Sequence, residues 1–458
     1  MINFIIKYWY IPILVLIFLT GIILTIRLRG IQFRCLGKAL KLMFSSKKDG
    51  EGEVSTFGAL CISLSATIGT GNIIGVATAL AIGGPGALFW MTFFAIFGLA
   101  TKYSEGFLAI KYRKFSSNGE VQGGPFAYIE YGMGKKFIPL AKTFALCAAI
   151  ASALGIGTMT QSNGISEAII NVVPLNIANL HLNFFNQNVS IVSLVVGMII
   201  TILTGLIIFG GVKRIAKVCE YIVPFMAFIY LGSTLLILIL NYQLIPNALK
   251  DIVILAVNPK SAIGALAGYT ILKAIVNGAQ KGIFANEAGL GSTPIALATS
   301  STNDPVKEGL ISMAGMVITI VICIMTGLAV VITNAYNTGL LGINITNLAF
   351  TKGLIFNETF SSVILLLCII FFAFTTIIGW NVYGVKCINY LTNNNQKVAK
   401  IYIVFYLLMV YLGSFLKVDL IWNLADIFNG LMAIPNLIAL IYLSKDVSKT
   451  TIDVLYKE

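Results

Sequence analysis

The chain contains little charge and only one histidine. Of its 458 residues, 11% are charged and 58% are hydrophobic, and the mean hydropathy is +0.91. A soluble domain is about a quarter charged, so this composition excludes an ordinary soluble protein and predicts a polytopic membrane protein in a lipid bilayer. The single histidine, His181, lies in a polar stretch and is interpreted as an exposed loop residue.

The sequence also lacks the patterns of a disulfide framework, a metal centre or an active site. Its seven cysteines are scattered and show no C-x-x-C spacing. No Ser/His/Asp, Cys/His or phosphate-loop constellation stands out, so we expect neither catalysis nor an organic cofactor. No small-residue cleavage site follows the first apolar run, which is therefore expected to remain as a membrane helix.

Long apolar runs separated by short basic loops dominate the chain. A membrane helix needs about 20 apolar residues, and eleven runs qualify: 9–28, 56–82, 86–112, 138–172, 189–210, 215–241, 262–299, 307–335, 359–385, 397–416 and 426–444. The net charge of +13 comes from lysines and arginines in alternate loops. That alternation indicates membrane topology rather than nucleic-acid binding, with the N-terminus outside and the C-terminus cytoplasmic.

The runs divide into an N-terminal part and two sets of five. We interpret 1–55 as a first helix with a basic loop, 56–241 and 262–444 as two five-helix repeats, and 445–458 as a cytoplasmic tail. An odd number of spans per set inserts the second set with opposite orientation. Such an inverted repeat places the transport site near the midplane, between the halves.

The first span of each repeat contains glycines that interrupt a helix. These segments are Ser65–Asn72, with the sequence SATIGTGN, and Asn277–Gly282, with the sequence NGAQKG. Broken membrane helices expose backbone groups that can bind ligands, and matched breaks point to a transport site. The alternative is that the glycines allow neighbouring helices to pack closely.

Several motifs resemble one known family. In chain order they are ATIGTGNIIGVATAL, GGPGALFW, TKYSEGFLAIKYR, GGPFAYIE, GIGTMTQSN, KGIFANEAGLGSTPIA and IPNLIAL. Spread from about residue 56 to 440, they resemble the alanine or glycine:cation symporter family of the amino acid–polyamine–organocation superfamily.

The resemblance implies an all-α fold with one N-terminal helix and a five-plus-five inverted repeat of the leucine-transporter type. It further implies sodium-coupled uptake of alanine or glycine by alternating access in a cell membrane, with Na⁺ as the co-transported ion. One departure concerns the cation: Ile318 precedes Thr319 where the family has an aspartate.

An amino acid substrate requires donors for its carboxylate and acceptors for its ammonium group. The N–H groups of Gly69, Thr70 and Gly71 open a half-helix and suit the carboxylate. Carbonyl groups near Thr67 and near Val276 to Gly278 would receive the ammonium group.

Two side chains are expected to complete the pocket. By resemblance Gln161 faces the substrate; the alternative is a bond to a neighbouring helix. Trp380 follows Thr376 by one helical turn, so the two share a face, and both are assigned to the substrate pocket. The alternative for the tryptophan is a position at the membrane interface.

Sodium prefers oxygen ligands, and two sites are expected. Asn72 matches an asparagine that contacts one ion in the superfamily's sodium transporters, and the Thr67 carbonyl would join it. The second set comprises Phe372, Thr375 and Thr376, opposite carbonyl groups near Ser65 and Ile68. The alternative is that these threonines bond only to their own helix backbone.

Charged residues within predicted spans are functional candidates, and the main ones are Lys102, Glu105, Lys281 and Glu287. They are candidates for an inner gate, or for side chains that reach the membrane interface. Proton coupling, exchange, and a channel or sensor that binds without pumping remain alternative functions. The L or D preference and the oligomeric state stay open.

Overall fold

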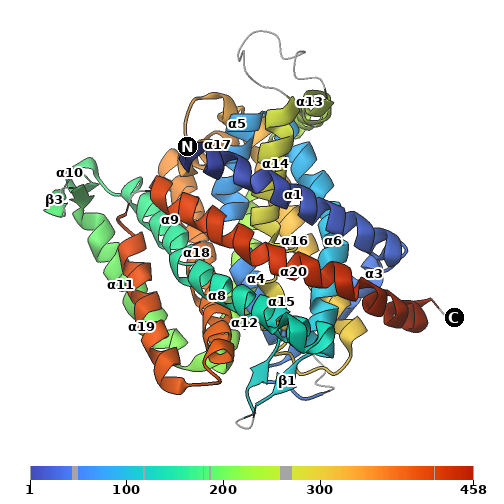
Figure 1. The fold of residues 1–458 in the computed structure, drawn as a ribbon. Coiled ribbons are helices and arrows are strands. Elements are labelled where there is room, and N and C mark those ends of the chain that lie inside the picture. Colours follow the sequence, from blue (N-terminus) through green and yellow to red (C-terminus); the bar gives the residue numbers. More distant parts are fainter. Residues whose placement is uncertain are drawn as a thin grey trace.

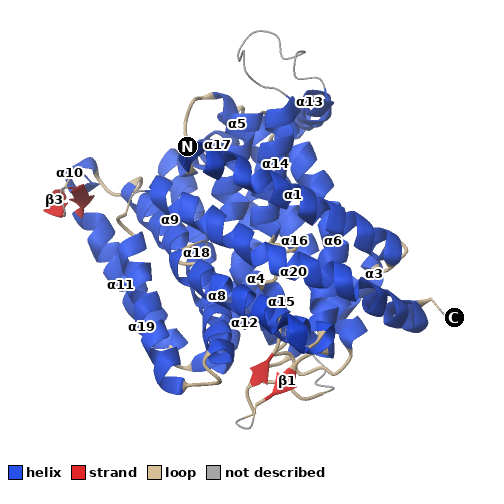
Figure 2. Ribbon diagram, viewed as in Figure 1, coloured by secondary structure: helices blue, strands red, loops and turns tan. Residues whose placement is uncertain are grey.

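The computed structural model describes residues 2–43, 50–116, 119–155, 157–178, 180–184, 187–257, 271–416 and 418–456. Helices form nearly all of this structure (Figure 2). The α-helices are α1 (Ile2–Arg27), α2 (Ile31–Arg34), α3 (Leu36–Met43), α4 (Thr56–Thr67), α5 (Val76–Gly83), α6 (Gly86–Lys111), α7 (Pro125–Ala127), α8 (Ile138–Leu154), α9 (Met159–Ile170), α10 (Leu175–Ala178), α11 (Ile191–Ile208), α12 (Gly211–Leu240), α13 (Ile245–Val257), α14 (Ile271–Asn286), α15 (Thr293–Leu297), α16 (Pro305–Ile332), α17 (Ile343–Gly353), α18 (Glu358–Leu391), α19 (Gln396–Gly413) and α20 (Val418–Leu455).

Short segments link these helices. The π-helical segments are η1 (Gly71–Gly75) and η2 (Tyr128–Met133), and the 3₁₀ segments are η3 (Lys135–Phe137), η4 (Tyr242–Leu244) and η6 (Ala335–Asn337). Two antiparallel hairpins pair β1 (Lys114–Phe115) with β2 (Val121–Gln122) and β3 (His181–Phe184) with β4 (Gln187–Ser190). His181 is exposed, as expected, but begins β3 instead of lying in a loop.

Among the described residues, eight helical segments are long and apolar enough to cross a bilayer. The pair formed by Thr56–Thr67 and Gly71–Gly83, bent by 48°, would be a ninth. These nine correspond to nine of the eleven predicted spans. Of the other two, the N-terminal span is a shorter apolar stretch, Ile11–Arg27, and the span 262–299 begins in residues 258–270, outside the described part.

The helices pack so that the interrupted ones lie inside. α4 contacts α12, α15, α16 and α18, and all its residues except Phe57 are buried. α1 and α20 lie side by side across one face of the bundle, and α11 pairs with α19 at another edge (Figure 1). The polar groups near α4 are therefore buried inside the bundle, where a site sheltered from lipid must be.

Two predicted boundaries differ from the structure. The single span predicted over 138–172 is two helices, α8 and α9, with the chain leaving helical geometry at Gly155. The helix predicted to end at 444 continues to Leu455, so most of the predicted tail belongs to α20. Contacts hold this extension: Asp446 accepts hydrogen bonds from Lys111 and Tyr112, at 2.5 and 2.6 Å.

The second predicted break was wrong. α14 runs without interruption from Ile271 to Asn286, through all of 277–282. A Cβ at Gly278 would lie 2.4 Å from the Ala87 carbonyl oxygen, and one at Gly282 would lie 2.9 Å from Met91. These glycines allow α14 to approach α6 closely, which is the packing alternative considered from the sequence.

We expect Gly278→Ala to destabilise the fold. The added methyl group would meet the backbone of α6, and overpacking of this kind costs about 1–3 kcal/mol. The measurement is the melting temperature of the purified protein in detergent. The matched control is Gly232→Ala in α12, where nothing lies within 4 Å of the new Cβ and the melting temperature should be unchanged or higher. Equal melting temperatures for both variants would contradict this packing.

Candidate functional site at two helix breaks

The first break is located where the sequence predicts it. α4 ends at Thr67, and Ile68 is extended, with φ −88° and ψ 91°. The π-helical η1 starts at Gly71 and continues into α5. The amide N–H of Gly69 is satisfied locally, because it donates to Asn72 Oδ1 at 3.0 Å. The whole turn is buried, so its remaining backbone groups face protein rather than lipid.

Gln161 reaches this break from α9. Its Oε1 accepts a hydrogen bond from the Thr70 N–H at 3.2 Å. A Cβ on Gly69 would lie 3.2 Å from the same Oε1. The structure therefore brings together Gly69, Thr70 and Gln161, which the sequence assigned separately to the substrate.

Thr376 reaches the break from α18 on another side. Its Oγ1 lies 2.9 Å from the Ser65 carbonyl oxygen and 3.3 Å from the Ile68 carbonyl oxygen. The carbonyl oxygen of Phe372, one turn earlier in α18, is 2.8 Å from the same hydroxyl group. One hydroxyl hydrogen can satisfy only one of these acceptors fully. Three carbonyl oxygens thus converge on one hydroxyl oxygen, a donor set suited to a hard cation.

Thr375 does not join this set. Its hydroxyl group lies 2.9 Å from the carbonyl oxygen of Phe371, which belongs to the same helix. It also lies 3.4 Å from Met226 Sδ on α12. Adjacent residues of a helix point about 100° apart, so only one of two neighbouring threonines can face α4. The expectation that both hydroxyl groups face the first break was wrong for Thr375.

Trp380 closes the same region. It is fully buried, and its Nε1 donates to the Ala66 carbonyl oxygen at 3.3 Å. A Cβ built on Gly157 would lie 2.4 Å from the Trp380 Cβ. The interfacial alternative is excluded, because the indole ring packs inside the bundle against the end of α4.

Asn72 and Thr67, which the sequence assigned to one sodium site, are both buried and hydrogen-bonded. Asn72 Nδ2 donates to the Ala285 carbonyl oxygen at 3.2 Å and lies 3.4 Å from Cys323 Sγ. Its side chain thereby ties the first break to the end of α14. The Thr67 hydroxyl group donates to the Ser63 carbonyl oxygen at 2.8 Å, and Thr67 lines a small cavity that also contains Lys102.

The second helix break follows α14 and was missed at this position. The chain between Asn286 and Thr293 contains Glu287, Gly289 and Gly291 with φ values of 50°, 86° and 80°. These left-handed conformations end α14, and only glycine adopts them without strain. The signal was present in the motif NEAGLGS, whose two glycines are spaced like those of the first break.

Polar side chains from other helices hold this second break. Glu105 Oε1 accepts from the Gly291 N–H at 3.2 Å and from Asn436 Nδ2 at 2.8 Å. Asn436 Nδ2 also lies 2.9 Å from the Gly289 carbonyl oxygen. The Ser292 hydroxyl group donates to Glu287 Oε2 at 2.6 Å. Asn436, absent from the residues considered from sequence, thus links α20 to the break.

The charged residues near the second break are buried. Lys102 is 2% exposed, Glu105 0% and Glu287 1%, so these three do not extend to the membrane interface. Lys281 is half-buried on α14. Ile318 is also half-buried and packs against the core, while its neighbour Thr319 donates to Asn286 Oδ1 at 2.6 Å.

The comparisons agree with this architecture. The chain is 42% identical over 443 residues to the sodium/alanine symporter AgcS of Methanococcus maripaludis, covering 94% of this chain and 91% of that protein. It is 37% identical to the probable sodium/glutamine symporter GlnT of Bacillus subtilis, covering 95% of this chain and 86% of that protein. An uncharacterized transporter of Haemophilus influenzae is 47% identical, covering 97% of this chain and 93% of that protein.

A solved structure confirms the fold class. The crystal structure of MhsT in complex with L-phenylalanine matches with a TM-score of 0.58, covering 88% of this chain and 99% of that one. At 12% identity this likeness shows the fold alone, an all-α membrane architecture of the leucine-transporter type. The model of the sodium:alanine symporter family matches residues 1–457. This multi-pass membrane protein therefore belongs to the sodium:alanine symporter family.

Proposed function

We propose that this protein is a secondary symporter, not an enzyme, which takes up alanine and glycine with Na⁺ by alternating access. The observation that carries the proposal is the first break, where non-helical backbone groups, Gln161 and the oxygens around Thr376 meet within a few ångströms. Membership of the sodium:alanine symporter family and the similarity to the sodium/alanine symporter AgcS support the same function.

The break offers an amino acid both of the partners it needs. The N–H groups of Thr70 and Gly71 begin the second half-helix and suit a carboxylate. In this structure the Thr70 N–H group donates its hydrogen bond to Gln161 Oε1. An arriving carboxylate would displace that oxygen, and the freed glutamine oxygen would accept from the substrate ammonium group. Gly278 has no part in this arrangement, because it packs against α6.

The close packing around the first break favours a substrate with a small side chain. Gly69 lies directly against Thr376 and Gln161, and Trp380 fills the space beside Gly157. The segment Ser65–Asn72 also carries no acidic residue, which disfavours a cationic cargo. Alanine and glycine fit these limits better than glutamine, the substrate named for the relative GlnT.

Sodium is assigned to the oxygens around Thr376. Ser65 and Ile68 supply carbonyl groups from the last turn of α4, directly before the residues assigned to the substrate. An ion at this position would hold α4 against α18 and so shape the break for the amino acid. Binding of the two would then be coupled reciprocally, as linkage requires.

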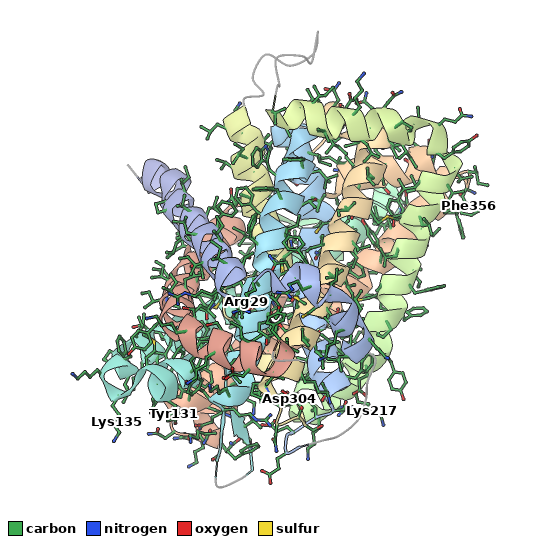
Figure 3. All side chains as sticks on the ribbon, turned by 90° about the vertical axis from the view of Figure 1, so that its right-hand side faces the viewer. Arg29, Tyr131, Lys135, Lys217, Asp304 and Phe356 are labelled. Atoms are coloured by element: carbon green, nitrogen blue, oxygen red, sulfur yellow. The ribbon has the colours of Figure 1, made fainter. Side chains whose placement is uncertain are left out.

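We propose the predicted topology and repeats for the chain: 1–55, two inverted repeats over 56–241 and 262–444, and a cytoplasmic C-terminus. Figure 3 shows Lys135 and Lys217 at one end of the molecule and Phe356 toward the other. The β1–β2 hairpin lies at that same basic end (Figure 1). Basic residues mark the cytoplasmic side, so this end would face the cytoplasm of a cell membrane.

An ion pair and several hydrogen bonds join separate segments at the basic end. Lys386 Nζ of α18 pairs with Glu53 Oε1, before α4, at 2.5 Å. The Arg113 guanidinium group donates to the carbonyl oxygens of Ala298 and Thr302, at 2.8 and 2.7 Å. Release of substrate into the cytoplasm requires α4 to move away from α18, so the Glu53–Lys386 pair would have to separate in each cycle.

Transport into proteoliposomes tests the proposed function. We expect labelled alanine and glycine to accumulate when an inward Na⁺ gradient is imposed, and labelled glutamine to accumulate much less. The control is the same preparation with K⁺ replacing Na⁺. Uptake that ignores Na⁺ but follows a proton gradient would refute sodium coupling, and preferential glutamine uptake would refute the substrate assignment.

A further inference from the structure

Lys102 is a buried cation that sodium symport does not explain. It lies in the middle of α6 and is 2% exposed. Its Nζ donates a hydrogen bond to the Thr293 hydroxyl group at the start of α15. A buried charge in a membrane protein is unfavourable unless it is paired, and such residues commonly serve transport.

Lys102 lines a cavity bounded by hydroxyl groups. The cavity has room for about one water-sized particle. Its polar lining residues come from α4, α6, α15 and α16: Ser63, Thr67, Lys102, Thr293, Ser312 and Thr319. Among the residues that the structure describes, the Ser312 hydroxyl group finds no hydrogen-bond partner. A space of this size, bordered by these polar side chains together with Leu64, Gly315 and Met316, can hold one water molecule or one small monovalent cation.

Two acidic side chains, Glu105 and Glu287, lie near the single ammonium group of Lys102. Glu105 lies one turn along the same face of α6, and Glu287 approaches from the second break. Both carboxyl groups are buried, and Glu105 Oε2 has no hydrogen-bond partner within the described part of the chain. Other elements facing this cluster contribute uncharged groups, including Asn436 of α20 and Tyr383 of α18. The ammonium group therefore shares its buried surroundings with two carboxyl groups.

We propose that the Lys102 ammonium group is a fixed intramolecular cation bordering this cavity, so that each amino acid is carried with one Na⁺. The inference rests on the proposed sodium symport and adds its stoichiometry. Thr67, expected from sequence to help bind a separate ion, lines the same cavity as Lys102. A second Na⁺ there would be repelled by the ammonium group in a medium of low dielectric constant. The oxygens around Thr376, on the other side of α4, remain for the one transported ion.

The coupling ratio of the unaltered protein tests this inference. Proteoliposomes would be loaded with fixed gradients of Na⁺ and labelled alanine, and the membrane potential varied with K⁺ and valinomycin. The potential at which net alanine flux vanishes gives the number of Na⁺ ions per alanine. A ratio of one is expected, and a ratio of two or more would overturn the inference. Alanine flux without any dependence on Na⁺ would instead refute the proposed function.

The Lys102→Ala variant provides a second test. Without the ammonium group a second Na⁺ should enter beside the carboxylates, so transport becomes second order in Na⁺. Halving a limiting Na⁺ concentration should then reduce initial uptake about fourfold, against about twofold for the unaltered protein.

The matched control is Lys111→Ala on the same helix, where the lysine is partly exposed and paired with Asp446. This variant should remain first order in Na⁺. An active Lys102→Ala protein that is also first order would overturn the inference. If the Lys102→Ala variant does not fold or transport, the coupling ratio of the unaltered protein still tests the inference.

Discussion

Replacing Thr376 with alanine should reduce sodium affinity by about ten- to a hundredfold, because a contact between a polar group and a charge contributes about 1.5–3 kcal/mol. The Thr376 hydroxyl group is the point where carbonyl groups of Ser65, Ile68 and Phe372 meet. Without it, an ion loses one oxygen ligand and α4 loses its polar contact with α18. The measurement is the Na⁺ concentration that gives half-maximal alanine uptake.

Two further variants make this prediction specific. Thr376→Ser retains the hydroxyl group and should retain most of the sodium affinity. Thr375→Ala removes a neighbouring hydroxyl group that contacts Phe371 and Met226, and it should change sodium activation little. Equal losses for Thr375→Ala and Thr376→Ala would show that both hydroxyl groups act together, as the sequence pattern suggested.

Replacing Gly69 with alanine should reduce amino acid uptake about 5- to 150-fold, the range that corresponds to about 1–3 kcal/mol of lost binding. The new Cβ would lie 2.7 Å from Thr376 Oγ1 and 3.2 Å from Gln161 Oε1. Both neighbours are buried and hydrogen-bonded to the break, so neither can move without disturbing the site. Initial rates of labelled alanine uptake at saturating Na⁺ provide the measurement.

Gly75→Ala is the matched control for this variant. Gly75 ends the π-helical segment after the same break, and nothing lies within 4 Å of a Cβ built there. Alanine uptake by the Gly75→Ala variant should remain near that of the unaltered protein. If Gly75→Ala fails as badly as Gly69→Ala, the effect comes from helix flexibility, and the proposed close approach of Gly69 to the site is refuted.

The first break could be predicted because its cause is local. The pair Gly69 and Gly71 weakens a helix wherever it packs, and the structure bends there by 48°. The second break could not be placed in the same way. Gly278 and Gly282 look equally disruptive in sequence, yet they stay helical because α6 lies against them. Glycine permits both a turn and close packing, and the neighbouring helix decides between them.

Hydropathy alone determined the class of this protein, because lipid admits only segments whose backbone groups are bonded internally. The same reasoning, with the motifs, identified the family and nine spans that the structure also contains. Which side chains share a site was decided by tertiary structure. Thr375 and Thr376 are neighbours in sequence but face different helices, whereas Glu105, Gly291 and Asn436 are distant in sequence and joined by hydrogen bonds. Helix rotation and packing determine such contacts, and these depend on the whole bundle rather than on any one segment.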